Sequence, residues 1–132
     1  MTLVDANILI DLFTDDPQWS VWSAERLIEC SEVGLVGINP IIYAEASVAF
    51  RTQTAFDAAL NPLSLIRWDL PYVAGFRAGK AFLDYRRNGG ERRSPLPDFY
   101  IGAHAAVSKL KVLTRDPTRF RRYFPEVELI AP

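Results

Sequence analysis

Short apolar runs alternate with longer helix-like stretches along this 132-residue chain, and this alternation constrains the fold more than any other feature. Strands are predicted for five runs that are too short for a helix, at residues 2–4, 35–38, 63–68, 111–114 and 127–130. Helices are predicted between them, at residues 7–13, 17–33, 40–50, 54–61, 71–87, 98–108 and 117–122. Such alternation favours a parallel sheet with both faces covered. We therefore expect a three-layer α/β/α sandwich.

Two helix starts are marked by a capping residue followed by proline, at Asp16-Pro17 and at Asn39-Pro40. Asp and Asn accept hydrogen bonds from the free N–H groups of the first helical turn, and proline suits the first helical position. Thr54 is expected to cap the short helix that follows. Gly34 is expected to end the helix that begins after Asp16.

The bulk composition is that of an ordinary globular chain, with 49% hydrophobic and 23% charged residues. One domain spanning residues 1–132 is the expectation at this length. Cys30 is the only cysteine, so an internal disulfide is ruled out, as is typical of a reducing compartment. The start of the chain lacks the basic flank of a signal peptide, and no apolar stretch is long enough to span a membrane. A soluble, cytoplasmic protein is expected.

Four acidic residues, Asp5, Glu45, Asp98 and Asp116, stand where such a fold would gather them. Asp5 and Asp116 follow predicted strands, and parallel sheets form their sites beyond the carboxyl ends of the strands. Oxygen-only carboxylate clusters suit hard cations such as Mg²⁺ and Mn²⁺. Proteins that bind such cations commonly use them for phosphoryl chemistry.

Each acid also has a simpler interpretation. Asp5, Asp98 and Asp116 directly precede predicted helices, so each can be a helix cap. Glu45 lies on a nearly all-apolar helix, where an uncompensated carboxylate is costly to bury. A shared metal ion would compensate its charge, and a buried arginine partner is the competing explanation.

The remaining titratable residues are weaker candidates. Asp11 lies near the far end of the first helix, and Asp69 follows the third predicted strand, where it could line the edge of the pocket. His104, the only histidine, should point away from the Asp98 face of its helix. Hydrolysis by this chain would therefore use a metal-activated water rather than a histidine base. The sequence lacks a glycine-rich phosphate loop and a G-x-S-x-G motif.

The formal net charge of -1 hides an asymmetry between the two halves of the chain. Residues 1–50 hold eight acids and one base, whereas residues 77–122 hold twelve bases and four acids. This distribution indicates a polyanionic partner beside a metal-dependent site. Solvated helix faces with scattered arginines are the alternative explanation, and on charge alone that explanation is favoured.

Four segments resemble the PIN-domain family, and among its members the VapC-type toxins of prokaryotic toxin–antitoxin modules. They are residues 4–11 (VDANILID), 39–45 (NPIIYAE), 95–105 (PLPDFYIGAHA) and 113–120 (LTRDPTRF). They occur in the family's order and are spread over nearly the whole chain.

The resemblance implies a Mg²⁺- or Mn²⁺-dependent endoribonuclease that hydrolyses RNA phosphodiester bonds, with one or two bound ions. Asp5, Glu45, Asp98 and Asp116 match the family's metal-binding, catalytic acids. Polar positions that steady those acids are matched by Asn7 and Thr114.

The resemblance also implies partners: an RNA substrate, a cognate antitoxin protein and a second copy of the chain in a homodimer. RNA phosphates would be contacted by arginines that precede Asp98, namely Arg86, Arg87, Arg92 and Arg93. Two alternatives stay open. One is a catalytically idle PIN fold that acts as a binding scaffold. The other is a Mg²⁺-binding signalling receiver domain. Such a domain requires an acidic pair after the first strand and a lysine after a late one, whereas here Asp5 stands alone and Thr114 stands in the place of that lysine.

Overall fold

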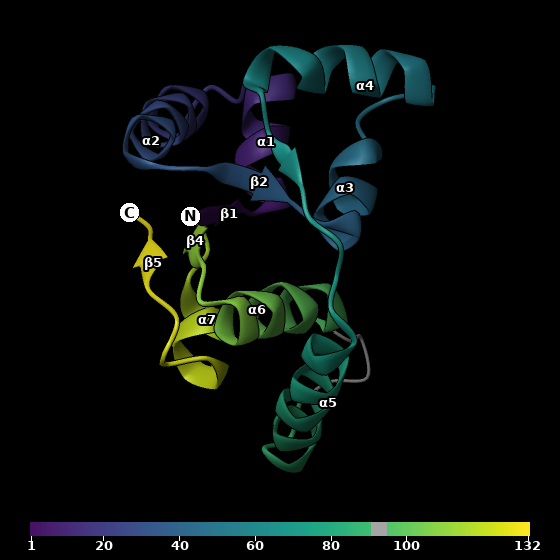
Figure 1. Cartoon of the computed structure of the whole chain (residues 1–132), viewed down its shortest axis with the longest axis vertical. Helices are drawn as coiled ribbons and strands as arrows, with labels where there is room; N and C mark the ends of the chain where they lie inside the picture. Colours follow the sequence, from purple (N-terminus) through teal and green to yellow (C-terminus); the bar gives the residue numbers. More distant parts are fainter. Residues whose placement is uncertain (91–94) are drawn as a thin grey trace.

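A central sheet of five parallel strands organises the protein in the computed structural model, which describes residues 1–90 and 95–132 (Figure 1). The strands are β1 (Thr2–Val4), β2 (Val36–Ile38), β3 (Ile66–Arg67), β4 (Lys111–Leu113) and β5 (Leu129–Ile130). Their order across the sheet is β3-β2-β1-β4-β5, and every neighbouring pair is parallel.

Helices flank the sheet on both sides, which confirms the predicted α/β/α sandwich (Figure 1). Helices α1 and α2 pack on each other, and α6 packs against both α5 and α7. The helices are α1 (Ala6–Phe13), α2 (Ser20–Val33), α3 (Pro40–Ser47), α4 (Gln53–Leu60), the 3₁₀ helix η1 (Asn61–Leu63), α5 (Tyr72–Arg87), α6 (Leu96–Ser108) and α7 (Thr118–Tyr123). None of the described helices has the length and apolar character that a membrane crossing requires.

The strand order reverses next to β1. The chain builds β1, β2 and β3 outward in one direction and then returns to place β4 on the other side of β1. A crevice at such a reversal, beyond the carboxyl ends of the strands, is the usual ligand site of an open parallel sheet. A receiver domain has the order 2-1-3-4-5, so the observed order rules out that alternative.

The core is built from the two central strands and the aromatic side chains of α6 and α7. Leu3, Val4, Val112 and Leu113 are fully buried. Helix α6 approaches the chain after α7 so closely that a side chain at Gly102 would collide with the Phe124 ring. Helix α6 and the chain after α7 are therefore closely packed beside the buried strands.

Two helix starts differ from the prediction because capping side chains act at other positions. The Asp16 carboxylate accepts hydrogen bonds from the N–H groups of Gln18 and Trp19, at 2.9 and 2.8 Å, and caps a turn, so α2 begins only at Ser20. Helix α4 is capped by Thr52, whose hydroxyl accepts from the Ala55 N–H at 3.2 Å, and not by Thr54.

Four other boundaries were wrong by two residues or more, and one of them is the start of β5, which lies at Leu129 rather than at residue 127. Strand β3 is shorter than predicted, because η1 and the left-handed Ser64 (φ 51°) occupy the start of the expected run. Helix α3 ends at Ser47 rather than near residue 50. Helix α6 begins at Leu96, so Asp98 lies within its first turn and is not its cap.

Candidate metal centre

The four acids singled out from the sequence line one cavity of about 390 Å³ at the carboxyl edge of the sheet. β1 leads to Asp5, α3 carries Glu45, α6 carries Asp98, and Asp116 follows β4. The complete lining is Asp5, Ala6, Asn7, Ile10, Glu45, Val48, Asp98 and Asp116. Side chains from four separate parts of the sequence therefore meet at one place.

Asp5 is the most buried of the four acids, with 5% of its surface exposed. Its Oδ1 accepts a 2.7 Å hydrogen bond from the Ala6 N–H, so it does cap α1 as the simpler interpretation held. The pKa of Asp5 is raised to about 6, mainly by burial, with a hydrogen bond from Thr114 opposing the shift and the nearby charges of Asp98 and Asp116 adding to it. Capping and membership of the acidic cavity are thus compatible.

A polar network behind the cavity orients Asp5. The Thr114 hydroxyl donates to Asp5 Oδ2 at 2.8 Å and accepts from the Asn7 amide at 3.2 Å and from the Asp116 N–H at 3.1 Å. The Asn7 amide also donates to Asp5 Oδ2 at 3.3 Å. Thr114 and Asn7 therefore link the end of β1 to the loop after β4.

Glu45 carries the least compensated charge in the cavity. Its Oε1 atom is buried and has no hydrogen-bond partner among the described residues. Burial, together with the smaller contributions of the Asp5 and Asp98 charges, raises the pKa of Glu45 to about 7. The competing explanation of a buried arginine finds no support, because no ion pair of the described residues includes Glu45.

Asp98 has an arginine partner that the sequence analysis missed. Arg119 Nη1 lies 3.2 Å from Asp98 Oδ2, with the two side chains 44% and 30% exposed. Burial nevertheless keeps the pKa of Asp98 above its usual value, with Arg119 opposing that shift. Arg119 stands in the first turn of α7, just after Asp116, and that proximity in sequence was the only available signal.

The carboxylates of the cavity suit a hard cation that keeps several of its waters better than one enclosed by protein ligands alone. Within residues 1–90 and 95–132, no group of three acidic, histidine or cysteine side chains is close enough to enclose an ion. Mg²⁺ usually keeps several waters and takes only one or two carboxylates. An open cavity with several carboxylates and one uncompensated oxygen matches that preference.

Three weaker candidates lie elsewhere. Asp11 is 1% exposed and pairs with Arg115, whose Nε lies 3.1 and 2.9 Å from its two oxygens. Asp69 lines a different cavity, beside β3. His104 is buried, and its Nδ1 lies 3.0 Å from the Asn39 amide nitrogen, while burial lowers its pKa. His104 does not line the acidic cavity, in agreement with the prediction that it points away from Asp98.

Of the four arginines expected to contact RNA, the two that the structure describes do not line the acidic cavity. Arg86 and Arg87 stand in the last turn of α5, which extends away from the sheet in Figure 1. The predictions for Arg92 and Arg93 fall outside the described residues.

Known proteins share this architecture. Similar solved structures include VapBC2 from Rickettsia felis bound to a promoter DNA fragment (TM-score 0.76, 17% identity, 99% of this chain and 98% of that chain covered). Others are a toxin–antitoxin complex from Klebsiella pneumoniae (TM-score 0.67, 24% identity, 91% and 90% covered) and DNA-bound VapBC from Salmonella typhimurium (TM-score 0.70, 21% identity, 98% and 96% covered). At these identities the likeness concerns the fold.

No curated protein sequence is detectably similar to this chain. The sequence model of the PIN domain, in contrast, matches residues 2–124, which span both central strands and all four cavity acids. The chain therefore belongs to the PIN-domain family.

Proposed function

We propose that this PIN-domain protein is a Mg²⁺- or Mn²⁺-dependent endoribonuclease and the toxin of a type II toxin–antitoxin pair, with residues 1–132 as one domain. The observation that carries the proposal is the buried, unpartnered Glu45 Oε1 in a cavity lined by three more carboxylates. A buried charge without a partner is costly, and a divalent cation would offset that cost. The fold shared with toxin–antitoxin complexes supports the biological role.

The cavity acids divide the work of hydrolysis between them. When bound, the cation supplies Lewis-acid stabilisation of the phosphate charge and lowers the pKa of water. Asp5 and Asp98 would hold it, with Asp5 oriented by the hydroxyl of Thr114 at 2.8 Å. Glu45 and Asp116 would complete the acidic lining and orient the attacking water through their carboxylate oxygens.

Cationic groups would hold the RNA backbone near these acids. Among the described residues, Arg119 is the arginine that pairs with a cavity acid, at 3.2 Å from Asp98. Its guanidinium would contact a phosphate near the bond to be cut. We retain Arg86, Arg87, Arg92 and Arg93 as further phosphate contacts. Each such contact on a single strand adds roughly −0.7 to the slope of log affinity against log salt. Replacing Arg86 and Arg87 by Ala should therefore flatten that slope by about 1.4 units.

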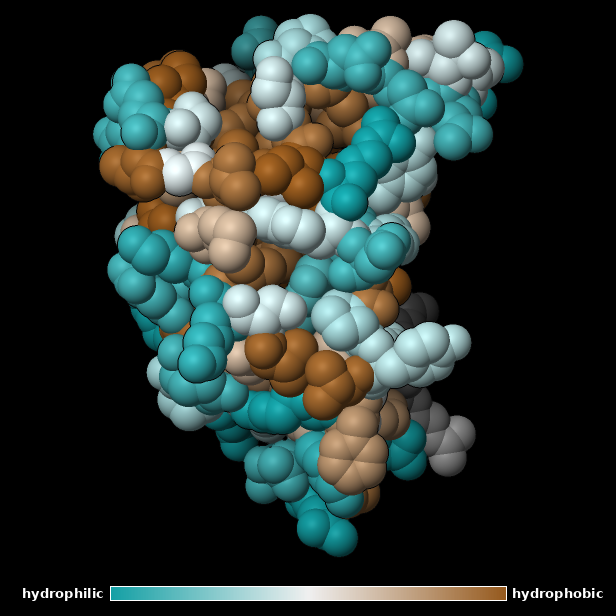
Figure 2. Space-filling model, viewed as in Figure 1, coloured by the Kyte–Doolittle hydropathy of each residue, from teal (hydrophilic) through white to brown (hydrophobic). Residues whose placement is uncertain are grey.

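Exposed apolar side chains support a protein partner. Val48, at the lining of the acidic cavity, is 78% exposed, and α5 exposes Tyr72, Val73, Phe76 and Leu83. Figure 2 shows apolar and hydrophilic side chains intermixed over the lower part of the molecule, where Figure 1 draws α5. An antitoxin segment would cover apolar surface and bring a basic side chain toward Glu45 and Asp98. A homodimer is also expected. Elution of toxin and antitoxin as separate species at micromolar concentration would contradict this assignment.

Cleavage of a defined RNA with Mg²⁺, Mn²⁺ or EDTA tests the enzymatic proposal. Wild type should cut only with metal, and Asp98→Asn should lose activity on the order of a hundredfold to a thousandfold while staying folded. The matched control is Asp84→Asn, because Asp84 is an exposed acid on α5 outside the cavity. An idle scaffold predicts no metal-dependent cleavage by wild type. Full activity of a folded Asp98→Asn protein would reject the assigned site.

A further inference from the structure

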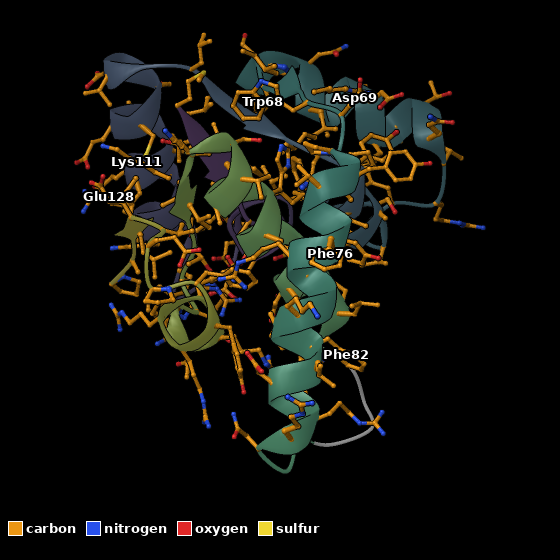
Figure 3. All side chains as sticks on the ribbon, turned by 60° about the horizontal axis from the view of Figure 1, so that its bottom comes forward. Trp68, Asp69, Phe76, Phe82, Lys111 and Glu128 are labelled. Atoms are coloured by element: carbon orange, nitrogen blue, oxygen red, sulfur yellow. The ribbon has the colours of Figure 1, made fainter. Side chains whose placement is uncertain are left out.

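A second cavity, of about 250 Å³, opens beside β3 at the same edge of the sheet as the acidic cavity. The end of β2, the start of α3 and the chain that leaves β3 all contribute to it, and none of its lining residues belongs to the acidic cavity. Its lining includes Tyr43, Gln53, Arg67, Trp68 and Asp69. Figure 3 shows Trp68 and Asp69 beside each other where the chain passes from β3 toward α5.

Trp68 is held in place by the sheet. Its backbone N–H donates a 2.8 Å hydrogen bond to the Ile38 carbonyl, which continues the pairing of β3 with β2. Its ring lies so close to Gly37 that any side chain there would collide with the ring carbons. The absence of a side chain at Gly37 thus creates the space that the indole occupies.

Tyr43 is positioned just as firmly. Its hydroxyl donates to Asp57 Oδ1 at 2.9 Å and accepts from the Gln53 amide at 3.2 Å. The Arg67 guanidinium lies 5.1 Å from the Tyr43 ring centroid and pairs with the same Asp57 oxygen at 2.9 Å. Two aromatic rings and a guanidinium are therefore arranged before any ligand arrives, which lowers the ordering cost of binding.

This lining matches the chemistry that recognises an unpaired nucleobase. Unstacked bases of single-stranded RNA stack on aromatic rings and on arginine guanidinium planes. Pockets for drug-sized ligands measure roughly 300–1,000 Å³. A cavity of about 250 Å³ therefore suits one planar ring system rather than an extended ligand.

The position of the cavity connects it to the acidic site. The acidic cavity forms at the ends of β1 and β4, whereas this one forms at the ends of β2 and β3. Neighbouring strands lie about 4.8 Å apart, so β3 and β1 are separated by roughly 10 Å. Helix α3 contributes to both, with Tyr43 on this cavity and Glu45 on the acidic one. An RNA strand with a phosphate among the acids could reach this cavity with a nearby base.

Asp69 gives the cavity a chemical preference. It is an exposed carboxylate on the lining, and an ionised carboxylate only accepts hydrogen bonds. Exocyclic amino groups of bases donate to such acceptors, and uracil has none. We propose that this cavity binds one base of the RNA strand next to the cleaved bond and favours a base with an exocyclic amino group. The inference rests on the ribonuclease function proposed above.

Fluorescence anisotropy with labelled octanucleotides rA, rC and rU, at low salt with EDTA to prevent cleavage, measures this binding directly. Wild type should bind rA and rC more tightly than rU. Trp68→Leu should weaken binding of all three by roughly tenfold, whereas Trp68→Phe keeps an aromatic face and should retain most of the affinity. Asp69→Ala should remove the preference over rU, and the matched control Asp84→Ala should not.

The outcomes separate this inference from the proposed function. Unchanged octanucleotide affinities in a folded Trp68→Leu protein would overturn the inference, as would an effect of that variant only on antitoxin binding. If Trp68→Leu fails to fold, the exposed Asp69→Ala variant decides, and an unchanged preference rejects the inference. Wild type that discriminates the octanucleotides but cleaves no RNA would retain the base site and reject the ribonuclease. If wild type and Asp69→Ala both cleave RNA and cut the same sequences, the ribonuclease function would be retained and the base site rejected.

Discussion

Two buried carboxylate sites at the two ends of helix α1 meet the cost of burial in opposite ways. At the C-terminal end, Asp11 accepts hydrogen bonds from the Arg115 guanidinium and from the Ser23 hydroxyl, the latter at 2.8 Å. At the N-terminal end, Asp5 shares a cavity with three other acids, among which the described residues provide one ion pair, that of Arg119 with Asp98. At the first site, partners within the chain compensate the carboxylate charge. At the second site, the described residues compensate only part of the charge.

The difference shows where a ligand is needed. A buried charge is tolerated when partners inside the protein compensate it, as at Asp11. At the acidic cavity burial instead raises the pKa of Asp5 to about 6 and that of Glu45 to about 7, so the four carboxylates on their own resist full ionisation near neutral pH. A perturbed cluster of this kind, in a cavity at the crevice of a parallel sheet, marks a functional site.

The largest expected contrast concerns stability. Asp11→Ala leaves Arg115, whose side chain is 31% exposed, without its carboxylate and should lower the free energy of unfolding by roughly 3 kcal/mol. Asp98→Ala removes an acid that is only partly compensated and should change it by less than about 1 kcal/mol. Urea denaturation in EDTA measures both values. Equal losses would show that the two sites are compensated alike.

The pH dependence of the metal-free protein should carry the signature of the acidic cavity. In the folded protein the pKa of Asp5 is about 6 and that of Glu45 about 7, against ordinary values of 3.8 and 4.5. Between roughly pH 4 and 7 the folded state therefore binds more protons than the unfolded state, so these two groups make stability fall as pH rises. Melting temperatures in EDTA from pH 5 to 8 should decline, and the Asp5→Asn, Glu45→Gln double variant should flatten the decline. Identical slopes in both proteins would contradict the assigned pKa values.

A smaller effect should follow from changing the ion pair between Arg119 and Asp98. The positive charge of Arg119 near Asp98 opposes a cation in the same cavity. Arg119→Gln should therefore tighten Mn²⁺ binding by roughly fivefold, the size of one partly screened charge interaction. Calorimetric titration gives the affinity, and Arg121→Gln, an exposed arginine on the same helix, is the control. Weaker binding by Arg119→Gln would mean that Arg119 helps to shape the cation site.

Local chemistry made much of the fold predictable. Asn39 caps α3 through a 3.0 Å hydrogen bond from the Ile42 N–H, as its position before Pro40 indicated. The alternation of strands and helices gave the layered architecture, and strand ends placed Asp5 and Asp116 at one edge of the sheet. These features depend on neighbouring residues or on the geometry common to all parallel sheets.

Side-chain pairing across the chain was not predictable. Arg115 and Asp11 are 104 residues apart, and Arg119 and Asp98 are 21 apart, so neither pair leaves a local pattern. Asp69 was considered for the acidic cavity because its distance from the other acids leaves no local pattern either. It lines the cavity beside β3, two strands away from β1. Composition alone could not distinguish the compensated Asp11 from the uncompensated Glu45.

The melting temperature with increasing Mn²⁺ at pH 7 tests most directly whether the acidic cavity is incomplete without a cation. A cation that binds only the folded state stabilises it by mass action, by about 2.7 kcal/mol at a hundred times its dissociation constant. Wild type and Asp11→Ala should both gain stability with Mn²⁺, because the Asp11 site already has its partners. The Asp5→Asn, Asp98→Asn double variant should show no gain. An undiminished gain in that double variant would place the cation elsewhere and contradict the account.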